Sequence, residues 1–287
     1  DALRIPKDAF FAHKVMWNGW VDVEEHGTHI VGHWNYTPGV VKPVYVVSSG
    51  DAVELFINNQ SAGVGKRTHH FMFIFDSVAW EPGSIEARSY DKNGQVISTD
   101  MIVTAGKPES IKLTLMQDPN GFLANGADLA LVEAEVVDSK GIRCPVAMNM
   151  LDFKLIGPAE WRGGMAQGPD NYILSTQLPV ECGVNRVLIR SLTSPGDIQL
   201  IANSDGLISD TLKLSSIKYD DKNGLSLHFP AELLPTNLEN GPTPQSNTFK
   251  ETRRSVPIVS ALAGSNQEKA KNSFDGSQTT RWANDGN

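Results

Sequence analysis

Apolar residues recur at every second position in a series of short runs between residues 27 and 218. The clearest run places Val53, Leu55 and Ile57 at alternate positions. Successive side chains of a β-strand point to opposite faces, so this period directs one set of side chains into a core. The 25 glycines and 16 prolines are scattered between the runs rather than clustered. The pattern therefore predicts an all-β protein built from short strands.

The runs form two groups, which predict two tandem immunoglobulin-like β-sandwiches, one over residues 20–106 and one over residues 107–218. In the first, alternating phenylalanines at 71–75 indicate a strand, and turn residues at 81–83 and 91–94 separate the strands that follow. In the second, which begins at Lys107-Pro108, residues 132–136 place Val and Ala inward and Glu toward water. We expect about seven antiparallel strands in each Greek-key sandwich, with little freedom at the join.

Residues 1–19 show a different period. Pro6 suits the first turn of a helix, because its missing N–H has no partner there. The helical spacing then gathers one apolar face and ends at Gly19. That face consists of Ala9, Phe10, His13, Met16 and Trp17. A single helix with so much aromatic surface is expected to pack against a further structure.

The C-terminal part loses the alternation. Residues 219–256 carry Pro230, Pro235, Pro242 and Pro244 among Asn and Thr, and predict a semi-extended linker. Residues 257–287 begin a new apolar pattern. A segment of that length is below the ~40 residues at which small domains fold unaided, so we expect no independent core there.

The net charge and the lengths of the apolar runs limit the classes of partner that this chain can have. The formal net charge is −8, which disfavours phosphate backbones and nucleic acid. No apolar run approaches the ~18 residues that would span a bilayer, and the first residues do not resemble a signal peptide. Localisation cannot be read from this chain. Cys144 and Cys182 lie in the same predicted sandwich; two separate thiols are favoured, and one bridge remains open.

Several motifs imitate functional sites. Residues 63–68 look like a phosphate loop, but Gln60 stands where the first glycine belongs. His26, His29 and His33 would share one face of a helix, yet they flank a predicted strand and are not expected to converge on a metal. No pair of carboxylates has a recognisable acid–base context. We therefore assign no catalytic residue and no metal site.

Tryptophans beside turn residues are the remaining candidates. Trp34 and Trp80 are expected to plug the end of a sandwich core. For Trp161 a core position and a sugar-stacking position are both open, and Arg162 could hydrogen-bond sugar hydroxyls. The glycines at 163 and 164 would let a ligand approach the backbone closely. Trp161 and Arg162 are thus the candidate sugar contacts.

Six segments carry a resemblance to family 2 glycoside hydrolases, bacterial β-galactosidases in particular. Residues 4–10 resemble the last helix of the catalytic (β/α)8 barrel. The segments 33–35, 53–59 and 80–87 resemble the sandwich after the barrel, with Asn59 replacing a usual Gly, and segments 157–164 and 178–181 resemble the next sandwich. The resemblance covers about residues 3 to 218.

Residues 270–282 are similar to the opening of a discoidin-like (coagulation factor type C) module. In many members the residues matching Asp275 and Thr280 help to hold a structural Ca²⁺, and Ser277 stands where an Asp is common. The remaining strands and ligands of the module are absent here. The resemblance therefore implies Ca²⁺ only for a complete module, and we expect no cofactor otherwise.

The resemblance implies a non-catalytic accessory region that props the barrel and spaces a sugar-binding module from it. Its partners would be the catalytic barrel of the parent enzyme and carbohydrate. The family's catalytic glutamates lie on barrel strands, and no residue of this chain matches them. The parent would cleave β-linked sugars in carbohydrate metabolism, in the periplasm or outside the cell, while this fragment alone would be inactive. A stand-alone carbohydrate-binding module and an immunoglobulin-like adhesin are the alternatives.

Overall fold

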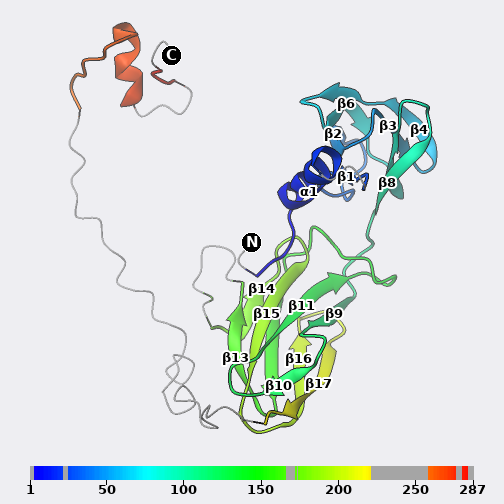
Figure 1. The fold of residues 1–287 in the computed structure, drawn as a ribbon, viewed down its shortest axis with the longest axis vertical. Helices are drawn as coiled ribbons and strands as arrows, with labels where there is room; N and C mark the ends of the chain where they lie inside the picture. The colour runs from blue at the N-terminus through cyan, green and yellow to red at the C-terminus, as the bar shows by residue number, and fades with distance from the viewer. Residues whose placement is uncertain are drawn as a thin grey trace. The chain divides into compact units, whose positions relative to one another are not determined.

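A computed structural model describes residues 3–21, 25–165, 172, 174–220, 258–275 and 280–283. Within these residues one α-helix and seventeen strands precede a short 3-10 helix (Figure 1). The elements of the first half are α1 (Asp8–Trp20), β1 (Thr28–Ile30), β2 (Val41–Ser48), β3 (Ala52–Ile57), β4 (Gln60–Val64), β5 (Lys66–Thr68), β6 (Met72–Ala79), β7 (Ser84–Tyr90) and β8 (Val96–Val103). The others are β9 (Ser110–Met116), β10 (Phe122–Ala124), β11 (Leu129–Val137), β12 (Met150–Ile156), β13 (Ala159–Gly164), β14 (Gln177–Pro179), β15 (Val184–Ser191), β16 (Gly196–Asn203), β17 (Asp210–Lys218) and η2 (Gln267–Ser273).

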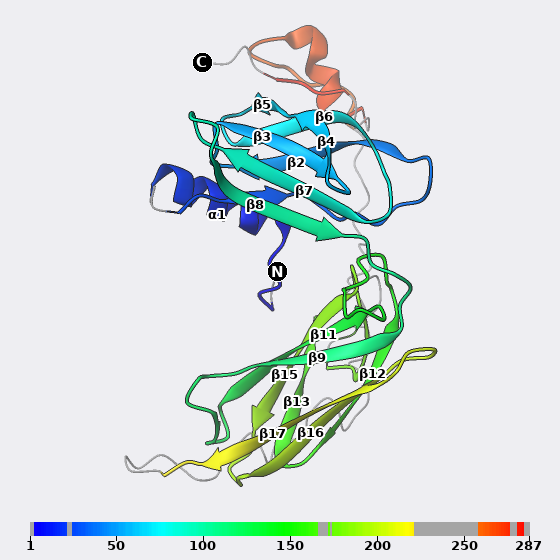
Figure 2. The ribbon, with the colours of Figure 1, turned by 90° about the vertical axis from the view of Figure 1, so that its right-hand side faces the viewer.

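The first sandwich consists of two four-stranded sheets, ordered β1-β2-β6-β5 and β4-β3-β7-β8 (Figure 2). All its strand pairs are antiparallel. Val53, Leu55 and Ile57 on β3 are buried between the sheets, as the alternation predicts. They pack with Phe73 and Phe75 of β6 in one apolar cluster.

A two-residue turn joins β3 to β4. Asn58 and Asn59 both have positive φ angles, 49° and 65°. A tight hairpin with the twist of natural strands requires this left-handed pair, and Asn tolerates it better than most residues. Asn58 and Asn59 therefore form the tight turn of the β3–β4 hairpin.

The helix α1 packs on β1 and β2 of the first sandwich (Figure 1). Val15 is buried in this contact, and the ring of Phe11 stacks on that of His29 with 4.7 Å between centroids. The predicted apolar face of the helix points the other way and is exposed. The helix also continues through Gly19, where a Cβ atom would lie 2.5 Å from Ser49 Cβ. Gly19 is thus a point of close packing rather than a helix stop.

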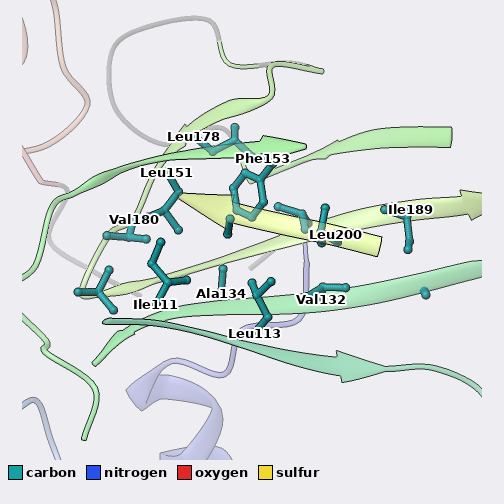
Figure 3. Close-up of a cluster of buried hydrophobic side chains, with 14 of the residues drawn as sticks. Ile111, Leu113, Val132, Ala134, Leu151, Phe153, Leu178, Val180, Ile189 and Leu200 are labelled. Atoms are coloured by element: carbon teal, nitrogen blue, oxygen red, sulfur yellow. The ribbon is translucent and has the colours of Figure 1, made fainter. Parts of the chain in front are cut away.

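The second sandwich pairs the sheet β13-β15-β11-β9 with the sheet β10-β17-β16-β12-β14. Its core lies between them: Ile111, Leu113, Val132 and Ala134 of one sheet face the side chains of the other (Figure 3). Those include Leu151, Phe153, Leu178 and Leu200.

Strand pairing differs from the prediction in two respects. The described residues of the sandwiches form eight and nine strands rather than seven each. In addition, β10 pairs with β17 in parallel, whereas we expected only antiparallel pairs. β10 lies between β9 and β11 in sequence but belongs to the opposite sheet, so the chain crosses the sandwich twice there. Such a crossing frees the strand from hairpin geometry and allows the parallel direction.

The segment around Trp161 is a strand, β13, although Trp161 stands beside residues typical of turns. Its register against β15 shifts between Trp161 and Gly164. Gly163 has a φ of 79°, and a Cβ atom on Gly164 would lie 2.5 Å from Leu178 Cδ1. The paired glycines therefore form a β-bulge packed against the core, which is a common use of glycine within strands.

Residues 245–287 belong to a second compact unit, of which residues 258–275 and 280–283 are described. Among these, Ala270 on η2 is the buried apolar residue, while Val259 and Leu262 are almost fully exposed. Trp282 Nε1 donates to the carbonyl of Ser265 at 3.1 Å. Beyond residue 220, the linker predicted for residues 219–256 lies outside the described residues.

Candidate functional site

The loop between β1 and β2 is held by hydrogen bonds to distant parts of the first sandwich. The side chain of Asn35 donates to the carbonyl of Ala105 at 2.9 Å and accepts from its N–H at 3.0 Å. The carbonyl of Trp34 accepts from Thr104 Oγ1 at 2.7 Å and from Trp80 Nε1 at 3.1 Å. Trp34 itself is 1 % exposed, within the core. A loop tied at so many points presents its other side chains in a fixed arrangement.

Three such side chains, from His33, Tyr36 and Lys42, form a cluster at the surface of this loop and of β2. The rings of His33 and Tyr36 stack with 4.6 Å between centroids. Lys42 Nζ donates to Tyr36 Oη at 2.6 Å. All three side chains are half-buried, and the ring of Trp34 meets that of Tyr36 edge-on from the core side. We call these three residues the donor cluster.

The surroundings of His33 favour the neutral form of its imidazole. Burial lowers its pKa, and the neighbouring ammonium of Lys42 lowers it further, while Asp8 acts in the opposite direction. The N–H of Asn35 donates to His33 Nδ1 at 3.0 Å. A ring nitrogen that accepts carries no proton, so the ring proton lies on Nε2. His33 is therefore a neutral donor through Nε2.

Helix α1 is attached to the sandwich through His29. Asp8 Oδ1 lies 2.8 Å from His29 Nε2, and Asp100 Oδ2 lies 3.7 Å from Nδ1. Asp100 also accepts from the N–H of Ile30 at 2.7 Å. On the opposite face of the helix, Phe10 is 56 % and Trp17 is 63 % exposed. The helix thus has one anchored face and one open apolar face.

A second attachment joins the start of the chain to the second sandwich. Arg186 on β15 pairs with Glu133 on β11, with 2.7 Å between Nε and Oε2. Its Nη1 atom donates to the backbone carbonyls of Leu3, at 3.2 Å, and of Arg4. Arg186 is buried, so its guanidinium connects the residues before α1 directly to the sheet.

The two candidate sugar contacts have different surroundings. Trp161 is 6 % exposed, its ring packs on Phe153 with 5.3 Å between centroids, and its Nε1 donates to the carbonyl of Ser175. This is the core position left open from the sequence, and it offers little ring surface to a ligand. The side chain of Arg162 is 41 % exposed and lies 3.1 Å from Glu160. Arg162 therefore keeps accessible donors.

Asp275 and Thr280 are adjacent in the structure, with 2.7 Å between Thr280 Oγ1 and Asp275 Oδ2. Throughout the described ranges, no three or more His, Cys, Asp or Glu side chains gather as a metal site would require.

Both cysteines are free thiols, Cys144 buried and Cys182 exposed. The helices of the described residues include none of the length and apolarity that crossing a bilayer requires.

The sequence did not reveal the donor cluster, although it singled out one of its members and one residue that packs against it. His33 drew attention as one of three histidines, and Trp34 as a core plug. Lys42 comes close to them because the chain reverses direction between the antiparallel strands β1 and β2. The combination His-x-x-Tyr followed by Lys is too common to be a signal by itself.

Two family models match the chain. Residues 31–98 match a domain of unknown function (DUF4982), and residues 113–213 match the glycoside hydrolase family 2 C-terminal domain 5. The two matched ranges fall in the first and second sandwiches. The segments that resembled sandwiches lie in the same two sandwiches, whereas residues 4–10, which resembled the last barrel helix, precede both matched ranges.

Relatives and solved structures agree with these models. A β-glucuronidase of Formosa agariphila is 39 % identical over 246 residues, which are 85 % of this chain and 24 % of the relative. A β-galactosidase of Bacteroides ovatus is 31 % identical, over 75 % of this chain and 25 % of the relative. The solved structure of a family 2 β-glucuronidase matches with a TM-score of 0.74 and 40 % identity, covering 80 % of this chain and 24 % of that one. The chain spans about a quarter of the length of such relatives.

Proposed function

The chain carries the C-terminal sandwich domains of family 2 glycoside hydrolases, and we propose that it is the non-catalytic region that supports the catalytic barrel of such an enzyme. The open apolar face of α1 carries this proposal. Phe10, Met16 and Trp17 expose large apolar side chains at helical spacing, although the opposite face already packs on the first sandwich. Exposed apolar surface of this kind marks an interaction site. The barrel of the parent enzyme is the occupant that the family resemblance implies for it.

The anchors of α1 support the same role. Asp8 and His29 fix the helix to the first sandwich, and Arg186 fixes the residues before it to the second. If this helix also packs against the barrel, its two attachments would fix the barrel to both sandwiches. The region would then stabilise the barrel rather than take part in bond cleavage.

The test compares one substitution in two settings. Trp17→Asp should leave the melting temperature of the isolated 287-residue chain nearly unchanged, because Trp17 is 63 % exposed there. In the enzyme that also contains the barrel, the same substitution should lower the melting temperature clearly, because it would bury a charge. Lys14→Gln, at an exposed position of the same helix, lowers the net charge by one as Trp17→Asp does and is the matched control for charge. Equal effects of Trp17→Asp in both settings would refute the proposal.

For the parent enzyme we propose hydrolysis of β-linked sugars, with β-glucuronides favoured over the β-galactosides implied by the resemblance. The relative at 39 % identity is named a β-glucuronidase, and the one at 31 % a β-galactosidase. Turnover of nitrophenyl β-glucuronide and β-galactoside by the parent would decide between them. The isolated chain should hydrolyse neither, and measurable turnover by it would contradict the non-catalytic role.

Two further parts of the proposal concern sugar and calcium. We retain Arg162 as a sugar contact, because its guanidinium is accessible, and assign Trp161 to the core beneath it.

We propose that residues 257–287 open a discoidin-like module, and the contact of Thr280 with Asp275 supports this. Calcium titration of a protein extended through the complete module, with Asp275→Ala as the comparison, tests that assignment.

A further inference from the structure

The donor cluster of His33, Tyr36 and Lys42 has hydrogen-bonding capacity that the described part of the chain does not use. His33 carries its proton on Nε2, because Nδ1 accepts from Asn35. Tyr36 Oη accepts from Lys42, which leaves its own proton available. Lys42 uses one of its three N–H groups in that contact. Within the described residues, the hydrogen bonds of these three side chains are those from Asn35 to His33 and from Lys42 to Tyr36.

These unused hydrogens belong to groups that cannot easily turn away. The ring of Tyr36 is held between the stacked ring of His33 and the edge of Trp34. The backbone beneath them is fixed through Trp34 and Asn35 to Thr104 and Ala105. Donors positioned in advance lose little entropy on binding, which is how a small surface site gains affinity.

The positive charge of the cluster favours an anionic ligand. Lys42 supplies one positive charge, and His33 adds a donor without a second charge. The carboxylate of Asp8, which acts electrostatically on His33, already lies 2.8 Å from His29 Nε2. Three donors around one positive charge match one carboxylate, which offers two oxygens and several lone pairs.

We propose that His33, Tyr36 and Lys42 bind the carboxylate of a uronic acid residue. The choice of a sugar acid rather than another carboxylate rests on the proposed function as part of a glycoside hydrolase; the carboxylate itself rests on the three donors. Lys42 pairs with one oxygen, while His33 Nε2 and Tyr36 Oη donate to the two oxygens from the aromatic side.

The test titrates the 287-residue chain with sodium D-glucuronate and follows its backbone amide resonances by NMR. D-glucose is the neutral probe, and glucose 6-sulfate is the anion of different geometry. Glucuronate should bind at least tenfold more tightly than glucose, with shifts centred on residues 33–42. Equal affinity for glucose and glucuronate, tighter binding of the sulfate, shifts centred elsewhere, or no saturable shift with glucuronate would each overturn the proposal.

Two variants connect the binding to the side chains. Lys42→Met keeps the aliphatic stem and removes the charge, so the preference for glucuronate over glucose should disappear. Tyr36→Phe keeps the ring and removes one donor, so affinity should fall severalfold; it answers the same question if Lys42→Met does not fold. Lys154→Met, at an exposed position of the second sandwich, should change nothing. An unaltered preference in both cluster variants would also overturn the proposal. Because this measurement needs only the chain, its outcome is separate from that of the barrel-support experiment.

Discussion

Trp34 and Trp80 hold each other in place through the main chain. Trp34 Nε1 donates to the carbonyl of Glu81, the residue after Trp80, at 3.0 Å, and Trp80 Nε1 donates to the carbonyl of Trp34 at 3.1 Å. Trp34 is within the core and Trp80 is half-buried. Each ring thus fixes the backbone that positions the other. The positions of the donor-cluster side chains depend on this fixed main chain.

Replacing each tryptophan should therefore have a graded effect on stability. Trp80→Phe keeps most of the ring and removes one hydrogen bond, which should cost about 1 kcal/mol of unfolding free energy. Trp34→Ala removes a fully buried ring and should cost about 3–5 kcal/mol. Urea unfolding followed by circular dichroism measures both. A Trp34→Ala loss as small as that of Trp80→Phe would show that the loop is not packed as described.

Arg186 should stabilise the attachment of the N-terminal residues. Arg186→Met removes the donor to the carbonyls of Leu3 and Arg4 and leaves Glu133 without this partner, so we expect a loss of about 1–3 kcal/mol. Amides of residues 5–15 should also exchange faster with solvent. Lys112→Met, which breaks the more exposed pair with Glu135, should have a much smaller effect. Unchanged exchange in α1 after Arg186→Met would contradict this role.

Asp138 makes the junction of the two sandwiches sensitive to acid. Burial would raise its pKa, but N–H groups of Gly106, Ile142 and Lys140 donate to its carboxylate and together lower the pKa below the usual value. A lowered folded-state pKa means that the carboxylate stabilises the fold above the unfolded pKa, about 3.9, and that this contribution is lost as the pH falls through the folded value.

Asp138→Asn should thus cost about 1–3 kcal/mol near pH 7, and the difference from the wild type should shrink below about pH 4. Unfolding in urea at several pH values gives both quantities. Asp76→Asn, at an exposed position of β6, is the control for loss of a charge alone. A difference that stays constant down to about pH 2 would rule out the titration of Asp138 as the cause.

The hairpin between β3 and β4 offers a substitution that should stabilise the protein. Asn59 has a φ of 65°, which glycine adopts without steric cost, so Asn59→Gly should raise stability by about 0.5 kcal/mol. Asn59→Ala should lower it by about 1 kcal/mol, because alanine tolerates the left-handed region poorly. Melting temperatures of the two variants should move in opposite directions, and movement in the same direction would contradict the turn geometry.

Substitution of Trp161 should affect stability, whereas substitution of Arg162 should affect sugar binding. Trp161→Ala removes a buried ring and should cost about 3–5 kcal/mol. Arg162→Ala should leave the melting temperature nearly unchanged and lower kcat/KM of the parent enzyme if the guanidinium reaches the sugar. Normal kinetics in Arg162→Ala would remove this residue as a contact. Normal stability in Trp161→Ala would be inconsistent with its core position.

The strands could be predicted where alternation reflects burial. Val132, Ala134 and Val136 are completely buried between outward glutamates, so their period identifies β11 directly. β4 is exposed along its whole length, and no alternation marks it. β13 was hidden by its own glycines, because Gly163 and Gly164 indicate a turn in the sequence although they form a bulge in the sheet.

The candidate site could be predicted only in pieces. Trp34 was expected in the core and lies there. The role of His33 depends on which ring nitrogen the N–H of Asn35 reaches, and Lys42 meets Tyr36 through the pairing of two strands. Neither relationship has a fixed spacing in sequence. The open face of α1 was visible as a helical period, but the side that packs on the sandwich was not.

The connection between the two sandwiches also bears on how such chains change in evolution. Ala105 is bonded through both its N–H and its carbonyl to Asn35 of the first sandwich, and the next residue, Gly106, donates to Asp138 of the second at 2.6 Å. No residue lies between these two attachments. An insertion or deletion here would displace one peptide group from its partner, so descendants of this chain should vary in length at hairpin tips such as residues 92–94 and keep the connection at constant length.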